Sequence, residues 1–82
     1  MTKEYAILVI ETGEYLYRKP NGCLMSKLNN SNPYYCTLAT YKKSQTANNV
    51  FTSGRQSIYI GERIIRLNMA NKPLFVVVEI NV

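Results

Sequence analysis

The segment Tyr5–Ile10 constrains the fold more than any other part of the chain, because its six successive residues are all apolar or aromatic. Successive side chains of a β-strand point to opposite faces, so an apolar strand of this kind needs cover on both sides. The pattern therefore predicts a strand in the middle of a sheet rather than one at its edge.

A tight turn follows this strand. Thr12 and Gly13 are typical turn residues, and Glu14–Arg18 resumes an alternating pattern with tyrosines on one face. The two segments predict an opening β-hairpin. Residues 19–22, Lys-Pro-Asn-Gly, end its second strand because proline cannot donate to a ladder. Cys23–Leu28 can continue the sheet, and an exposed polar loop is expected over residues 29–33.

The spacing changes in the middle of the chain. Ala47, Val50 and Phe51 recur at helical spacing behind Ser44, a residue type favoured at helix N-caps. The spacing predicts a short helix over residues 44–53. Gly54 then follows where a glycine can satisfy the last helical carbonyls.

The C-terminal third returns to strand patterns. Ser57–Ile60 and Arg63–Leu67 flank a Gly-Glu pair and predict a second hairpin, although residues 64–69 also suit an apolar helical stripe. Leu74–Val82 alternates clearly and is expected to pair near the first strand. The prediction is a single α+β domain over residues 1–82, a mostly antiparallel sheet of about four to five strands with one short helix packed on it.

The positive charge of the chain is concentrated in its middle. The net charge is +5, with a net −2 over residues 1–14, +1 over residues 62–82, and six cations without any acid between them. Such a segment favours anionic partners, which include nucleic acid, nucleotides and acidic protein surfaces. The composition also fits a simpler explanation, in which the lysines only keep the protein soluble.

The residue types exclude most enzymes. The chain of 82 residues contains neither histidine nor aspartate, so it cannot form a Ser-His-Asp or Cys-His triad or a histidine-based metal site. Glu11 and Glu14 flank a turn and are expected to be surface charges, while Cys23 and Cys36 are expected to be buried thiols. We predict a binding protein without catalytic activity, metal or cofactor.

No apolar stretch approaches the roughly 18 residues of a membrane helix, and none resembles a secretory signal, which predicts a cytoplasmic protein without membrane contact. A chain this short forms only a thin core, and a homodimer would add stability by mass action.

The order of the segments "TGEYLY", "TLATYKKSQTANNVF" and "LFVVVEINV" resembles that of small accessory proteins encoded by bacteriophages. In such proteins an aromatic residue closes a short turn and a small residue begins the next helix, as Tyr41 and Ala47 do here. The resemblance implies a phage origin and a cytoplasmic site of action in the host. It also implies that the protein binds a host defence or nucleic-acid-processing enzyme and inhibits or redirects it.

One group of residues combines cations and phenol rings and is the predicted binding site. Its members can neutralise anionic groups while offering aromatic surface, a combination found both in protein interfaces and in nucleic-acid sites. Tyr35 and Tyr41 can also fill the core instead. The leading hypothesis is docking on an acidic surface of a host protein, and the alternative is binding of nucleic acid or a nucleotide. The predicted residues are Arg18, Lys19, Tyr34, Tyr35, Tyr41, Lys42, Lys43 and Arg55.

Overall fold

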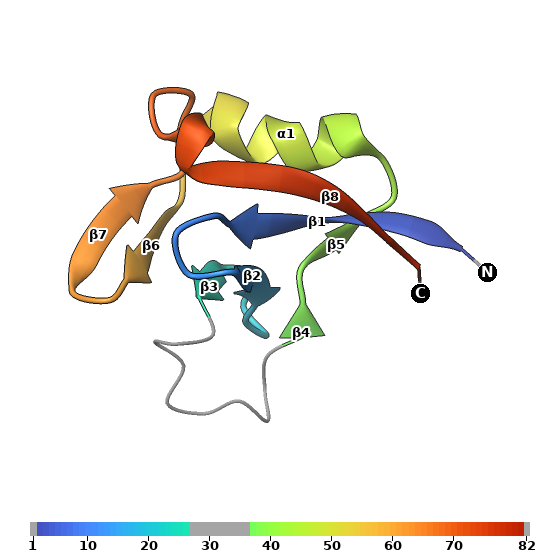
Figure 1. Ribbon diagram of the computed structural model, residues 1–82, viewed down its shortest axis with the longest axis horizontal. Helices are drawn as coiled ribbons and strands as arrows, with labels where there is room; N and C mark the ends of the chain where they lie inside the picture. The colour runs from blue at the N-terminus through green and yellow to red at the C-terminus, as the bar shows by residue number, and fades with distance from the viewer. Residues whose placement is uncertain (1, 27–36, 82) are drawn as a thin grey trace.

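The computed structural model describes residues 2–26 and 37–81 of the chain. Within these residues, eight strands form a six-stranded sheet and a separate two-stranded sheet, and all strand pairings are antiparallel (Figure 1). One α-helix accompanies the sheets. The predicted fold class, a small α+β domain with one short helix, is confirmed.

Strand β1 (Lys3–Val9) lies at the centre of the larger sheet, as the doubly apolar pattern of Tyr5–Ile10 predicted. One of its edges pairs with β8 (Phe75–Asn81) over all seven residues of both strands. Its other edge pairs with β2 (Glu14–Arg18) near one end and with β5 (Thr40–Tyr41) near the other. The strand is therefore enclosed on both edges, and Ala6 and Ile7 are fully buried.

The opening hairpin is confirmed, and β2 continues the sheet on its far side. Its second edge pairs with β3 (Leu24–Ser26), and Arg18 also pairs with Thr37 of β4 (Thr37–Leu38). Strands β4 and β5 were not predicted, because segments of two residues are too short to show an alternating pattern. The expected loop over residues 29–33 lies outside the described residues.

Helix α1 (Ser44–Ser53) lies across one face of the sheet and contacts β1, β5 and β8 (Figure 1). Ala47 and Phe51 are its buried residues, and the Phe51 ring lies 5.3 Å from that of Phe75. The predicted N-cap is wrong: Lys43 occupies that position in an extended conformation and makes no side-chain cap, since lysine has no acceptor atom. Gly54 ends the helix at φ 60°, as predicted.

The second hairpin is confirmed as β6 (Ser57–Ile60) and β7 (Arg63–Arg66), so the helical alternative for residues 64–69 is wrong. Gly61 supplies the positive φ of 63° that the two-residue turn requires. The hairpin projects from one end of the larger sheet (Figure 1). Its strand β6 contacts β3, and the side-chain oxygen of Gln56 accepts a hydrogen bond of 2.7 Å from the Leu24 backbone N–H.

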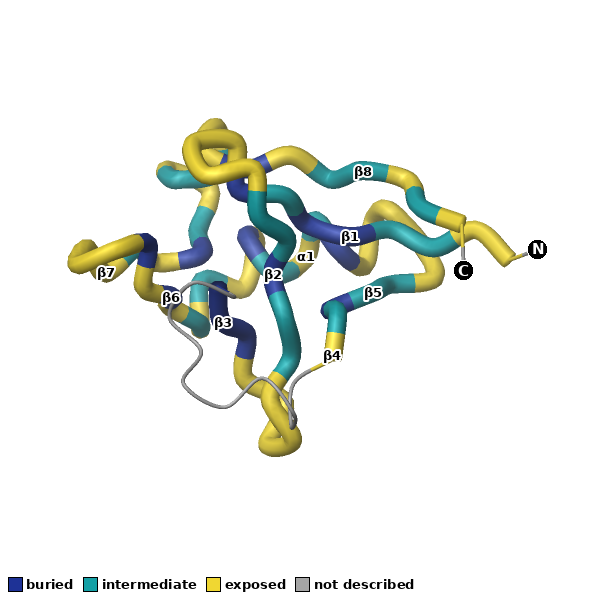
Figure 2. Tube along the Cα trace, turned by 60° about the horizontal axis from the view of Figure 1, so that its bottom comes forward, coloured by how far each residue is buried: buried dark blue, intermediate teal, exposed yellow. Residues whose placement is uncertain are grey.

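The core lies between the sheet, the helix and the second hairpin, and its residues come from all three (Figure 2). In β8, Phe75 and Val77 pack against this core, whereas Val76, on the opposite face of the strand, is 40% exposed. The prediction of a buried thiol is wrong for Cys23, which is exposed because it directly follows the surface turn at residues 20–22. Cys36 lies outside the described residues. No described helix is long and apolar enough to cross a membrane.

Candidate functional site

Strands β2 and β5 bring a cation and an aromatic ring together at one end of the sheet. Arg18 ends β2 and Tyr41 ends β5, and the guanidinium carbon of Arg18 lies 5.1 Å from the centroid of the Tyr41 ring. The Tyr41 ring is half-buried and also packs against the core. Tyr41 therefore contributes to the core, which is one of the two roles left open by its sequence, and its ring also contacts the Arg18 guanidinium.

Lys42 and Lys43 follow Tyr41 directly and lead into α1. Both side chains are exposed, and the first turn of the helix contains no acidic residue. The N-terminus of a helix carries a partial positive charge, which adds to that of the two lysines. We call Arg18, Tyr41, Lys42 and Lys43 the basic cluster.

The ion pairs of the described residues leave this cluster unneutralised. Glu79 pairs with Lys3 at 3.1 Å and Glu11 pairs with Arg63. Glu4 lies on β1, where its carboxylate accepts a hydrogen bond of 3.3 Å from the Thr40 hydroxyl and forms no ion pair with a described cation. Among the described residues, no carboxylate oxygen lies within 4.0 Å of a charged nitrogen of the basic cluster, which leaves the cluster free to attract an anionic surface.

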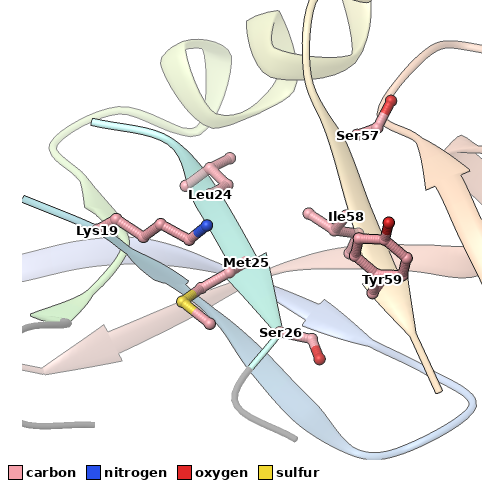
Figure 3. Close-up of a pocket in the computed structure, with 7 residues that line it drawn as sticks. All are labelled: Lys19, Leu24, Met25, Ser26, Ser57, Ile58 and Tyr59. Carbon is pink, nitrogen blue, oxygen red and sulfur yellow. The ribbon is translucent and has the colours of Figure 1, made fainter. Parts of the chain in front are cut away.

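Lys19 follows Arg18 in the chain, but its side chain lines a small pocket between β3 and β6 and does not join the basic cluster (Figure 3). The pocket encloses about 140 Å³, and the lysine side chain extends along it toward Leu24. Sites for drug-sized ligands usually measure roughly 300–1,000 Å³, so this pocket suits a single side chain of a partner and is too small for a nucleotide. Its lining residues are Lys19, Leu24, Met25, Ser26, Ser57, Ile58 and Tyr59.

The remaining predicted residues do not join the cluster. Arg55 is exposed but follows the C-terminal end of α1, and a ten-residue helix is about 15 Å long, so it lies far from Lys43. Tyr34 and Tyr35 lie outside the described residues.

Sequence reasoning also missed an exposed apolar pair on the second hairpin. Tyr59 and Ile64 lie opposite each other on β6 and β7 and are 53% and 63% exposed. The alternation of Ser57–Ile60 was the available signal, because it places Tyr59 on the face opposite the buried Ile58 and Ile60.

The described part of the chain contains no cluster of cysteine and carboxylate side chains that could hold a metal ion. Comparisons of the chain with protein-family models, with curated proteins and with solved structures gave no significant match. The site must therefore be interpreted from its own geometry, which is that of a cationic surface with one supported ring and a side-chain-sized pocket nearby.

Proposed function

We propose that this protein acts by binding an acidic surface of another protein through the basic cluster. The observation that carries the proposal is the exposure of Lys42 and Lys43 beside the Arg18–Tyr41 pair, with no ion pair to any described carboxylate. Opposite charge steers two proteins together and selects the correct orientation, while arginine and tyrosine are enriched among the residues that dominate binding energy.

The arrangement of the ring favours a protein partner over a nucleic acid. A tyrosine that stacks on bases must offer a free face, but Arg18 lies over the ring of Tyr41. The pocket beside Lys19 supports the same choice, because its size suits an acidic or apolar side chain of a partner. The net positive charge argues against mimicry of DNA, which requires an acidic surface.

The resemblance to phage accessory proteins supplies the proposed setting. In that setting the partner is a cytoplasmic host protein, such as a defence or nucleic-acid-processing enzyme, and binding inhibits or redirects it. The protein itself performs no catalysis under this proposal.

The test uses the immobilised protein in a nuclease-treated bacterial lysate at moderate salt. We expect the wild-type chain to retain one dominant protein and the Lys42→Glu variant to lose it. Lys72→Glu is the matched control, because it changes the net charge equally at a residue that lies outside the basic cluster, in the short 3-10 helix Lys72–Leu74. An empty eluate, or equal retention by both variants, would contradict the proposal.

A titration of the purified protein with DNA and RNA distinguishes the alternative function, nucleic-acid binding, from the binding of a protein. Binding that weakens steeply with salt, and that weakens equally for all sequences when Lys42 and Lys43 are changed to alanine, would indicate phosphate contacts. That result, together with an empty eluate, would replace the protein partner with a nucleic acid.

A further inference from the structure

Among the described residues, strand β8 forms an edge of the six-stranded sheet, with no strand on its outer side. It pairs with β1 along its full length, and no other described strand pairs with it. Figure 2 shows β8 at the margin of the fold, with α1 lying behind β1 and leaving the outer edge of β8 uncovered. A strand in this position presents unpaired backbone groups to its surroundings.

The register identifies which backbone groups point outward. The Ile10 N–H donates a hydrogen bond of 3.1 Å to the carbonyl of Leu74, and these two residues continue the β1–β8 register at the position of a hydrogen-bonded pair, although the Leu74 N–H donates to the Asn71 carbonyl instead. Such pairs alternate along an antiparallel ladder, so the N–H and C=O groups of Val76 and Val78 face β1. The groups of Val77 and Glu79 therefore face away from the sheet. The Phe75 N–H fits this phase, because it bonds to the Lys72 carbonyl and not to β1.

The devices that usually protect an edge strand are weak in β8. The strand contains no proline, and its register with β1 is unbroken over all seven residues, so it has no bulge. Its one charged residue, Glu79, is paired with Lys3 at 3.1 Å. The face of β8 opposite the core is aliphatic, with Val76 40% exposed and Val78 and Ile80 half-buried. This edge is thus nearly neutral and apolar, unlike the basic cluster.

We propose that β8 is the interface of a homodimer, in which it pairs antiparallel with β8 of a second copy about a two-fold axis through Val78. The outward-facing backbone groups then meet. Val77 exchanges backbone hydrogen bonds with Glu79 of the partner subunit, and by symmetry Glu79 exchanges them with Val77 of the partner subunit. On the aliphatic face, Val78 meets Val78 of the partner subunit, and Val76 meets Ile80 of the partner subunit. An isologous contact of this kind closes on itself and does not build a fibre.

Self-complementarity favours this register over its neighbours. Only a two-fold axis through Val78 pairs all seven residues of β8. An axis through Glu79 would place two carboxylates opposite each other, which is destabilising. An axis through Val77 leaves Ile80 and Asn81 without partners in β8, and an axis through Val76 leaves residues 78–81 without them.

The charge of the edge also favours a second copy over the acidic partner of the basic cluster. The chain as a whole is basic at +5, and two copies repel wherever their cations meet. Strand β8 itself carries one charge, that of Glu79, which is paired with Lys3 of β1, so two β8 strands approach without repulsion between cations. An acidic partner protein would find no unpaired cation on β8 to attract it. The dimer interface is independent of the proposed function, and either can fail without the other.

The first test is a disulfide placed on the two-fold axis. Residues in a non-hydrogen-bonded antiparallel pair have Cα atoms about 4.5 Å apart, which lies within the range for a disulfide. In a background in which Cys23 and Cys36 are serine, we expect mild oxidation to cross-link Val78→Cys into a dimer. Val76→Cys is the matched control: in this register the two copies of residue 76 lie roughly 13 Å apart and stay monomeric on a non-reducing gel.

The second test removes an outward donor without touching the β1–β8 ladder. Glu79→Pro deletes a backbone N–H that faces the partner, so we expect the dissociation constant, measured by analytical ultracentrifugation, to rise roughly tenfold or more. Glu79→Ala keeps this N–H and is the control. Far-UV circular dichroism checks that both variants fold.

Three results would overturn the interface. The wild-type chain could sediment as a monomer up to millimolar concentration, a result that needs no variant to fold. Val76→Cys could cross-link as efficiently as Val78→Cys, which would show an unspecific or different register. A folded Glu79→Pro could dimerise as tightly as Glu79→Ala, which would place the contact elsewhere.

Discussion

The side chain of Gln56 connects the two sheets, and replacing it gives a direct measure of that connection. Its Oε1 accepts a hydrogen bond of 2.7 Å from the backbone N–H of Leu24, which lies 32 residues earlier in the chain. The Gln56 carbonyl also accepts a hydrogen bond of 2.7 Å from the N–H of Leu67 at the end of the second hairpin. One residue thus holds β3 against both strands of that hairpin.

Gln56→Leu removes the acceptor and leaves the Leu24 N–H without a partner. Leu24 is 4% exposed, so little water can replace the lost oxygen. A buried donor without an acceptor costs about 1–3 kcal/mol. In a domain of this size each kcal/mol lowers the melting temperature by roughly 4–8 °C, so we expect a fall of about 4–24 °C. Gln56→Glu keeps an acceptor oxygen at the same position and should retain most of the stability.

The assays are thermal unfolding and urea unfolding, followed by far-UV circular dichroism and by tyrosine fluorescence, since the chain has no tryptophan. Amide hydrogen exchange of Leu24 gives a local readout, and we expect faster exchange in Gln56→Leu than in Gln56→Glu. A loss below about 0.5 kcal/mol, or an unchanged exchange rate at Leu24, would refute the reasoning, because it would show that the bond does not join the sheets.

Two further predictions concern the ends of α1 and the basic cluster. Gly54→Ala should lower the unfolding free energy by about 1–2 kcal/mol, because φ is 60° there, while its new Cβ would meet only ordinary contact with Asn68 at 3.7 Å. Gly54→Asn should cost less, and equal losses in urea unfolding would contradict this. In a double-mutant cycle, Arg18→Ala and Tyr41→Leu should show a coupling of about 0.5–1 kcal/mol from the cation over the ring. Additive losses would mean that the pair contributes nothing.

Period-two patterns predicted the long strands well. β2 spans Glu14–Arg18 as expected, and β8 pairs with β1 as expected. These segments are long enough for alternation to be visible, and each includes residues that pack in the core. The helix was predicted from helical spacing instead, and two of the three residues that showed this spacing, Ala47 and Phe51, are its buried residues.

The side-chain contacts between distant segments that form the candidate site could not be predicted. The Arg18–Tyr41 pair depends on β4 and β5, which carry the chain from β2 to β1 in strands of two residues each. The contact between β3 and the second hairpin depends on Gln56, a residue that no local pattern distinguishes. The predicted site therefore included Arg55, although α1 places this residue at the opposite end of the helix from Lys43.

The position of β1 between β5 and β8 bears on both proposals. β5, which ends at Tyr41 in the basic cluster, pairs with one edge of β1, and the open strand β8 pairs with the other. A dimer joined through β8 therefore leaves both basic clusters uncovered. Exposed ion pairs contribute only about 0–1 kcal/mol each, so a single cluster of three cations binds weakly. Two clusters in one rigid dimer make the second contact intramolecular, which raises the overall affinity for a partner with two acidic surfaces. Dimerisation would thus compensate for the small interface that a chain of 82 residues can offer.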